Sequence, residues 1–304
     1  MTGGQGIFCS IEELRQESLR AVGQTLHMRR RAHAQQSGLK RSSIRGRGME
    51  FFESRPYVSG DEVRNIDWKV SARLHGLYTK IFIEEKDRPC YLMVDLGPQM
   101  FFASRNCFKS VLAVKIAARL AHAALEGGDQ LGAMIFKTRE LIECPNMRSR
   151  AHLSRLLGML ASASLAGDES LREADFWSIA LSRVVNRVKS GALVFIISDF
   201  LGFNTAARPW LYKLRKKADI FALSLSDPLE KQMPVVGLVG MRYGEHKIML
   251  DTNNSNLQKK FRVWSETASL ERKKILSALA IPEIEFSTAD AIDSGLTRLF
   301  SGRW

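Results

Sequence analysis

Predominantly apolar segments alternate with amphipathic segments from residue 90 onward, and this alternation restricts the fold more than any other feature of the chain. The predominantly apolar segments have the length of strands and occupy residues 90–95, 129–136, 192–200 and 218–226. Segments with helical spacing of their apolar residues occupy residues 105–128, 149–164, 175–191 and 204–217. Helices that connect parallel strands bury both faces of the sheet, so such strands read as continuous apolar runs. The sequence therefore predicts an α/β fold with a doubly wound, mainly parallel sheet.

The pattern after residue 226 predicts an extension of this domain. Residues 235–251 are typical of a hairpin, and a long helix is expected over residues 254–280. A strand over residues 283–287, which could extend the same sheet, and a helix over residues 289–300 complete the chain. We expect this domain to run from residue 89 to residue 304.

The chain before residue 89 has a different character. A helix is expected over residues 11–34, because Ser10 and Glu13 have the spacing of a capping box at its start. Residues 35–51 are rich in Ser, Gly and Arg and are typical of a linker, whereas residues 76–86 alternate like a strand. The N-terminal part is thus predicted to be partly helical and partly β.

Positive charge is concentrated in a basic helical arm and linker that we expect over residues 1–48. The formal net charge of the whole chain is +13. The basic residues of this arm are Arg29, Arg30, Arg31, Lys40, Arg41, Arg45 and Arg47. Such a segment permits binding to nucleic acid, to an anionic surface or to an acidic protein, and it is also compatible with a solvated basic surface.

The composition predicts a cytoplasmic protein. No apolar run has the length of a transmembrane segment, and residues 1–16 lack the charged start and apolar block of a signal peptide. The four cysteines have no metal-binding spacing. We therefore expect free, buried thiols in a reducing compartment.

Two of the predicted strands end in an aspartate. Asp95 follows one apolar run and Asp199 ends another. The carboxyl ends of parallel strands meet at one edge of the sheet, where ligands bind in such folds. The pair is therefore a candidate site, although each carboxylate could equally cap the loop or helix that follows it.

The densest run of charge is ESRPYVSGDEVRNIDWKVSAR, residues 53–73, within a small segment with short strands that we expect over residues 49–88. Gly60 is expected in a turn. Asp61, Arg64 and Asp67 are spaced by three and are expected on one side of a short helical turn.

Trp68 lies between Ile66 and Val70 in the same run and is expected to pack inward. The cluster has two interpretations. It could be a polar network that makes this segment rigid, or it could recognise a partner.

The run resembles the signature of bacterial domain-of-unknown-function family fifty-eight, which precedes a von Willebrand factor A-like domain. The matching residues are Arg55, Tyr57, Gly60, Asp61, Arg64, Ile66, Asp67, Trp68, Ser71, Ala72 and Arg73. Residues 45–51 and 227–239 also match the flanking pattern of that family, so the resemblance covers about residues 15–250.

The resemblance implies an A-type, Rossmann-like domain with a metal-ion-dependent adhesion site, which holds Mg²⁺ through D-x-S-x-S, a threonine and a distal aspartate. The corresponding residues of this chain are Asp95, Gly97, Gln99, Ala174, Asp175 and Asp199. Gly97 and Gln99 replace the serines, and Ala174 replaces the threonine. Hydroxyl ligands of Mg²⁺ are thereby lost. We expect a degenerate site and no cofactor, with bound Mg²⁺ as the alternative.

The sequence lacks a P-loop, an H-E-x-x-H motif and a G-x-S-x-G motif. We therefore expect a non-enzymatic protein-interaction module. The resemblance implies a MoxR-type AAA+ ATPase and a client protein as partners. Two alternatives stay open: binding of nucleic acid or an anionic surface through the basic arm, and a metal-dependent hydrolase built on Asp95 and Asp199.

Overall fold

The chain forms two compact units. In a computed structural model, the described residues are 6–21, 49–84, 89–138, 140–165, 175–243 and 246–301. Residues 1–28 and 88–304 form the large unit, and residues 29–87 form the small unit.

The large unit is built on a six-stranded sheet with the strand order β10-β7-β6-β3-β4-β5. The strands are β3 (Pro89–Asp95), β4 (Gln130–Phe136), β5 (Leu141–Met147), β6 (Ala192–Ser198), β7 (Ala218–Ser226) and β10 (Glu283–Ser287). Five of them run parallel, and β5 pairs with β4 in the antiparallel direction at one edge. The prediction of a mainly parallel sheet is confirmed.

The apolar runs become central strands because both of their faces are covered. Every residue of β6 is buried, and its side chains alternate between two core layers. Leu193, Phe195 and Ile197 belong to one layer, whereas Val194 and Ile196 belong to the other. Successive side chains of a strand point to opposite faces, so a strand buried on both sides must be apolar throughout.

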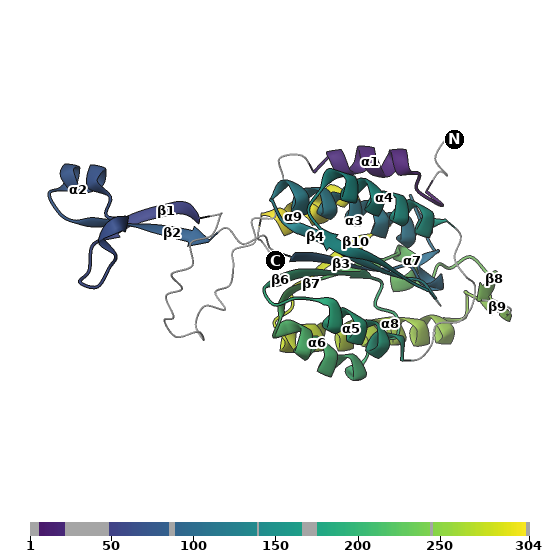
Figure 1. Cartoon of the computed structure of the whole chain (residues 1–304). Helices are drawn as coiled ribbons and strands as arrows, with labels where there is room; N and C mark the ends of the chain where they lie inside the picture. The colour runs from purple at the N-terminus through teal and green to yellow at the C-terminus, as the bar shows by residue number, and fades with distance from the viewer. Residues whose placement is uncertain are drawn as a thin grey trace. The chain divides into compact units, whose positions relative to one another are not determined.

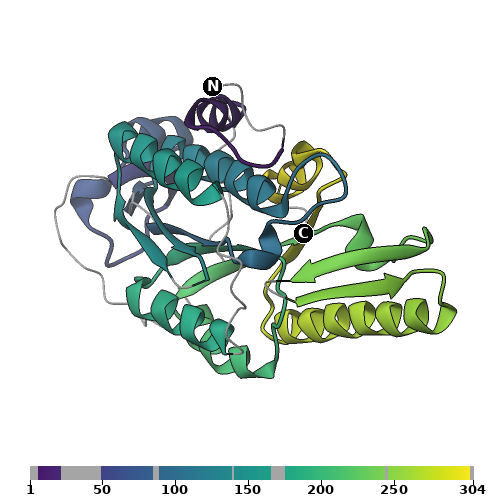
Figure 2. The ribbon, with the colours of Figure 1, turned by 90° about the vertical axis from the view of Figure 1, so that its right-hand side faces the viewer.

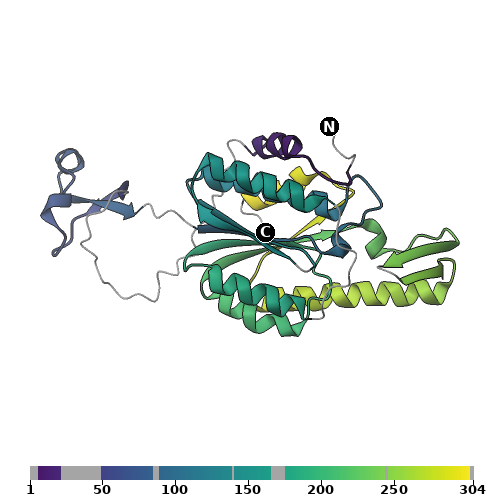
Figure 3. The same cartoon turned by 45° about the vertical axis from the view of Figure 1, so that its right-hand side comes forward.

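Helices cover both faces of this sheet (Figure 1; Figure 3). One face carries α1 (Ile11–Leu19), α3 (Lys109–Glu126), α4 (Arg150–Ser164) and α9 (Ile292–Phe300). The opposite face carries α5 (Phe176–Arg187), α6 (Arg208–Arg215) and α8 (Ser255–Ala278). This arrangement is that of a doubly wound α/β domain.

Helix α1 belongs to the large unit and not to a separate arm. Its capping box is as predicted, since the Ser10 hydroxyl accepts from the Glu13 amide and the Glu13 carboxylate accepts from the Ser10 amide. Leu14 is fully buried, and Glu17 receives a 2.6 Å hydrogen bond from Nε of the buried Arg119 in α3. Arg119 also pairs with Asp293 of α9. The boundary that we predicted after residue 48 therefore divides the chain differently from the structure, because α1 buries an apolar face against α3.

A hairpin and a helix extend the large unit beyond the sheet. Strands β8 (Leu238–Tyr243) and β9 (His246–Asp251) form the predicted hairpin, which lies beside α8 (Figure 2). The short helix α7 (Pro228–Lys231) leads from β7 toward this hairpin. The Ser265 hydroxyl of α8 donates to the Glu230 carbonyl of α7 at 2.9 Å, so the extension is tied to the carboxyl end of the sheet.

The small unit is a hairpin with short helical turns. Strand β1 (Met49–Pro56) pairs with β2 (Tyr78–Glu84) in the antiparallel direction. A 3₁₀ turn (Val63–Asn65) and helix α2 (Trp68–Leu74) lie in the connection between the two strands. A hairpin of this size buries little apolar surface by itself.

Several elements differ from the prediction. Strand β1 begins at Met49, inside the segment that we predicted to be linker, and β5, α2 and α7 were not predicted. Helix α1 ends at Leu19 with Arg20 as its C-cap, which is earlier than predicted, and residues 22–34 of the predicted helix lie outside the described residues. The same holds for all seven basic residues named above for the arm, from Arg29 to Arg47. Within the described parts of the chain, no helix is long and apolar enough to cross a bilayer.

The contact between α9 and β10 gives a test of the packing. A Cβ atom added to Gly295 would overlap the ring of the buried Phe286. Gly295→Ala should therefore destabilise the chain by about 1–3 kcal/mol, measured by urea unfolding.

The matched control is Gly158→Ala in α4, where the new methyl group would meet only Cδ1 of Ile11 at 3.6 Å. This variant should be as stable as the wild type or up to ~1 kcal/mol more stable, because alanine is the better helix former. Equal stability of the two variants would show that α9 does not pack on Phe286 as described.

Candidate functional site

The carboxyl ends of four neighbouring strands place polar side chains at one edge of the sheet. Asp95 ends β3, Asp199 follows β6, Asp227 follows β7 and Thr288 follows β10. The structure brings Asp95 and Asp199 together, because β3 and β6 are adjacent. Gln99 lies between them, with Nε2 at 3.4 Å from Asp95 Oδ2 and at 3.5 Å from Asp199 Oδ1. We call this set of residues the sheet edge.

Asp95 is fully buried and accepts hydrogen bonds on both of its oxygens. The Ser198 hydroxyl donates to Oδ2 at 2.5 Å, and the Gly97 amide donates to Oδ1 at 3.0 Å. The Ser198 hydroxyl also accepts from the Phe200 amide at 3.0 Å. Asp95 is thus tied to the loop that carries Asp199, and the glycine in the first serine position of the family motif contributes a backbone donor.

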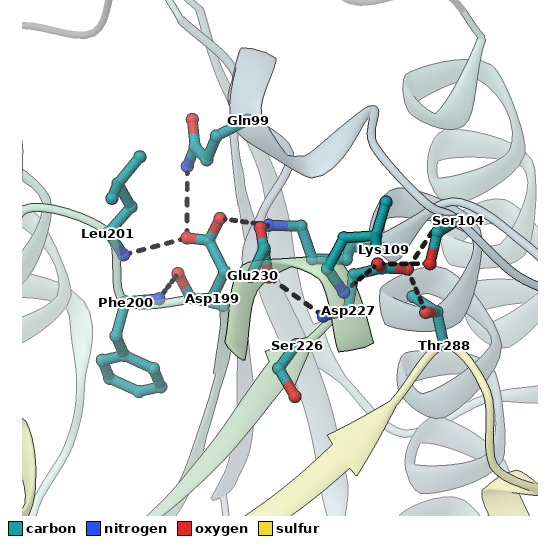
Figure 4. A network of polar contacts seen from close by, with 12 residues as sticks. Gln99, Ser104, Lys109, Asp199, Phe200, Leu201, Ser226, Asp227, Glu230 and Thr288 are labelled. Carbon is teal, nitrogen blue, oxygen red and sulfur yellow. Dashed lines mark hydrogen bonds and ion pairs between the residues drawn. The ribbon is translucent and has the colours of Figure 1, made fainter. Parts of the chain in front are cut away.

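A buried lysine neutralises Asp199. Lys109, the first residue of α3, is fully buried, and its Nζ lies 2.8 Å from Asp199 Oδ2 (Figure 4). The same ammonium pairs with Glu230 of α7. Burial by itself would lower the pKa of Lys109, but the carboxylates of Asp199 and Glu230 outweigh burial and raise this pKa above its ordinary value. The lysine is therefore charged.

The position of Lys109 in its helix makes these partners necessary. A cation at the N-terminus of a helix is opposed by the positive end of the helix dipole. An unpaired buried ammonium would in addition cost several kcal/mol. The carboxylates of Asp199 and Glu230 offset both costs, and Glu230 is itself held in place, since its Oε2 accepts from the Asp227 amide at 2.9 Å.

Asp227 is the centre of a second polar group at the sheet edge. It is fully buried and accepts from the Ser104 amide at 2.7 Å and from the Ser104 hydroxyl at 2.6 Å. The Thr288 hydroxyl donates to it at 2.5 Å and the Leu229 amide at 2.9 Å (Figure 4). Burial by itself would raise the pKa of Asp227, but these hydrogen bonds outweigh burial and lower it.

The residues at the sheet edge do not fit a Mg²⁺ site. Mg²⁺ needs oxygen ligands in octahedral geometry, whereas Asp199 faces the ammonium group of Lys109, whose positive charge opposes a metal ion there. Asp175 is an exposed residue that precedes α5, and Ala174 lies outside the described residues. No cluster of three or more His, Cys, Asp or Glu side chains suited to a metal ion occurs in the part of the chain that the structure describes.

The signature residues of the small unit form local contacts. Gly60 has a φ of +105°, which suits the predicted turn. Asp61 pairs with Arg55 at 2.8 Å and accepts from the Val58 amide at 3.0 Å, and the Tyr57 hydroxyl donates to the Asp61 carbonyl at 3.3 Å. Asp61 is therefore held against Arg55 at the end of β1 and against the residues that directly follow this strand.

Asp67 has a different role from Asp61. It caps α2 by accepting from the Val70 amide at 3.2 Å, and it accepts from the Ser54 hydroxyl at 3.0 Å. These hydrogen bonds, that from Val70 above all, lower the pKa of Asp67. The single helical turn predicted to align Asp61, Arg64 and Asp67 was wrong, because a 3₁₀ turn and α2 divide the segment.

The predicted inward packing of Trp68 was also wrong. Trp68 is 66% exposed, whereas the neighbouring Ile66 is buried. Ile66 forms a β-bridge with Thr79, and α2 directs Ser71 toward β2, where its hydroxyl accepts from the Tyr78 amide at 2.9 Å. Four residues close to Trp68 in the sequence are also exposed: Arg64, Lys69, Ala72 and Arg73.

Sequence reasoning missed Lys109, Ser198, Asp227 and Glu230. A signal existed for Asp227, because it follows a third apolar strand just as the other two aspartates do. A weaker signal existed for Lys109, which begins an otherwise apolar helix. The link between Lys109 and Glu230 had no signal, because 121 residues separate them.

Comparison with protein families matches residues 53–272 to the family described as "Protein of unknown function DUF58". Uncharacterized proteins of Mycobacterium tuberculosis and Mycobacterium bovis are each 29% identical to the chain over 211 residues, which is 68% of this chain. The chain spans 64% of the length of these curated relatives.

Two solved structures are similar at 13% identity. The hypothetical protein BatB from Bacteroides thetaiotaomicron aligns with a TM-score of 0.46, over 71% of this chain and 98% of that chain. An aerotolerance-related membrane protein from Bacteroides fragilis aligns with a TM-score of 0.38, over 62% of this chain and 99% of that chain.

The lowered pKa of Asp227 predicts a pH dependence of stability. A carboxylate whose pKa is lower in the folded state stabilises the fold above its unfolded value of 3.8, and this contribution is lost as the pH falls through the folded pKa. Asp227→Asn should therefore be ~2–3 kcal/mol less stable than the wild type at pH 7. The difference should shrink below pH 3.8 in urea unfolding series.

Asp290→Asn provides the control, because Asp290 is an exposed residue near Thr288. Its stability should stay within about 0.5 kcal/mol of the wild type at pH 7. A gap between Asp227→Asn and the wild type that is the same at all pH values would contradict the assignment of Asp227 as a buried carboxylate.

Proposed function

The chain belongs to the DUF58 family, and we propose that it is a non-enzymatic protein-interaction module of the bacterial cytoplasm. Its partner would be a MoxR-type AAA+ ATPase, and the two proteins together would assemble or remodel a client protein. The observation behind this proposal is the sheet edge. Ligands of α/β folds bind at the carboxyl ends of the strands, and here Lys109, Asp199 and Glu230 fill that position with internal ion pairs.

We interpret the large unit as a von Willebrand factor A-type domain with a degenerate metal-ion-dependent adhesion site. The parallel sheet with one antiparallel edge strand supports this interpretation. Support also comes from Asp95 and Asp199, which lie on adjacent strands as the two aspartates of such a site would.

The environment of the thiols and of a buried histidine supports a non-enzymatic role. Burial raises the pKa of the Cys9 thiol to about 12, and it also raises the pKa values of Cys107 and Cys144. His152 lies 3.5 Å from the Cys144 sulfur, but the contact is buried and the same ring nitrogen lies 3.0 Å from the Leu131 carbonyl. A reactive thiolate needs access and a lowered pKa. The pKa is raised in all three of these thiols, and Cys9 and Cys144 are in addition buried.

The surface of the small unit supports a protein partner. Among the residues of this unit that the structure describes, the exposed large apolar ones are Val58, Val63, Trp68, Leu74 and Leu77. Exposed tryptophans and arginines are enriched at the energetic centres of interfaces. Trp68 with the exposed Arg64 and Arg73 offers such a combination, and all three belong to the family signature. The partner surface would need an apolar pocket with acidic residues around it.

The charge of the chain favours a second candidate function, binding of nucleic acid or an anionic surface through the basic arm. The formal net charge of +13 includes Arg29, Arg30 and Arg31 in a single run. Binding of this kind must weaken steeply as salt rises. Contact through Trp68 would depend much less on salt, so a salt series separates the two candidates.

The direct test is binding of a purified MoxR-type ATPase from the same organism, loaded with ATP, to the nuclease-treated chain. Trp68→Ala should weaken binding by about tenfold or more, because truncation of a central interface tryptophan costs upward of ~2 kcal/mol. The unfolding midpoint of the variant should not change, since the side chain is exposed.

Trp264→Ala is the matched control, because Trp264 is a 54% exposed tryptophan of α8 in the large unit. It should bind the ATPase as the wild type does. Equal losses in both variants would place the contact elsewhere. Absence of binding by the wild type, both with ATP and without nucleotide, would refute the ATPase partnership.

A further inference from the structure

Every oxygen of the two central carboxylates at the sheet edge already faces a hydrogen-bond donor. Asp95 accepts from the Gly97 amide on one oxygen and from the Ser198 hydroxyl on the other. Asp199 accepts from the Leu201 amide at 3.0 Å on Oδ1 and from Lys109 Nζ on Oδ2. A metal ion bound to these carboxylates would have to share their oxygens with donors that the chain itself supplies.

Of these donors, the ammonium of Lys109 opposes a bound metal ion most strongly, because it is itself positively charged. It lies against two carboxylates that come from different parts of the chain, Asp199 after β6 and Glu230 in α7. A divalent ion between these carboxylates would have to take the position of Nζ. If Nζ stayed in place, the ion would lie beside a buried group that is also positively charged. Lysine and metal therefore exclude each other.

We propose that Lys109 is a tethered cation that replaces a divalent metal at the sheet edge. The ammonium supplies the positive charge between Asp199 and Glu230, and the chain needs no metal there. The donor set of the edge thus disagrees with the Mg²⁺ site that the family resemblance implies. This inference concerns the large unit alone and does not depend on the proposed partner.

The exposure of the three groups shows that Lys109 is shielded from solvent. Lys109 is fully buried and the Asp199 side chain is 5% exposed, whereas the Glu230 side chain is 36% exposed. Glu230 therefore covers Lys109 on the solvent side. It is held by its own bond to the Asp227 amide and by the bond from Ser265 to its carbonyl. The lysine is covered by a side chain that is itself fixed.

Thermal unfolding with added Mg²⁺, Mn²⁺ or EDTA tests the proposal. The melting temperature of the wild type should be the same in all three conditions. Lys109→Ala leaves buried carboxylates without their cation and should melt roughly 10 °C lower in EDTA. Millimolar Mn²⁺ should raise its melting temperature by several degrees, because the truncated side chain leaves room for the ion.

Lys109→Met is the matched control, because it removes the same charge but fills most of the same space. It should be destabilised like Lys109→Ala and should not respond to Mn²⁺. A second control, Lys109→Ala combined with Asp199→Asn, removes the carboxylate as well, so its response to Mn²⁺ should disappear.

Equilibrium dialysis of the wild type against Mn²⁺ keeps the test decisive even where Lys109→Ala does not fold. The proposal expects no retained Mn²⁺. One tightly held Mn²⁺ per wild-type chain, or a wild-type melting temperature that rises with either metal, would overturn it. A folded Lys109→Ala variant that melts like the wild type and ignores both metals would also overturn it.

Discussion

The ion pair between Lys109 and Asp199 is the interaction on which the candidate site depends. It joins the first turn of α3, which packs in the core of the large unit, to the loop after the central strand β6. Glu230 extends the pair to α7 and hence to the hairpin and α8. A buried ion pair of this kind contributes little net stability, but loss of either partner costs several kcal/mol. It therefore fixes one arrangement of these elements.

The other buried carboxylates near this ion pair also have their hydrogen-bond partners within the chain. Asp95, Asp199 and Asp227 all lie where strands end, and each accepts hydrogen bonds from side chains of the chain itself, namely Ser198, Lys109 and Ser104. The edge where α/β folds bind ligands is thus used here to hold the fold together. This places the proposed recognition surface on the small unit, where Trp68 is exposed.

The strands and helices of the large unit could be predicted because burial on both faces requires continuous apolar runs. Helix α1 could be placed by its capping box, and the adjacency of Asp95 and Asp199 followed from the parallel sheet. Strand β5 could not be predicted in this way, because it lies at an edge and its side chains are mostly not buried.

The missed parts of the site depend on contacts between distant residues. Lys109 and Glu230 read separately as a helix residue and a turn residue, and only the fold brings them together. Trp68 was mispredicted for a local reason. Apolar alternation predicts an inward tryptophan, but Asp67 starts a helix there and interrupts the alternation. The signature of the small unit therefore showed the family in the sequence but not its geometry.

An anomalous difference map from crystals of the wild type grown with Mn²⁺ would test most directly whether the chain supplies the cation at its own sheet edge. We predict Lys109 Nζ in contact with Asp199 and Glu230, and no anomalous peak at these carboxylates. A Mn²⁺ peak bound by Asp95 or Asp199, with Lys109 turned away, would contradict it.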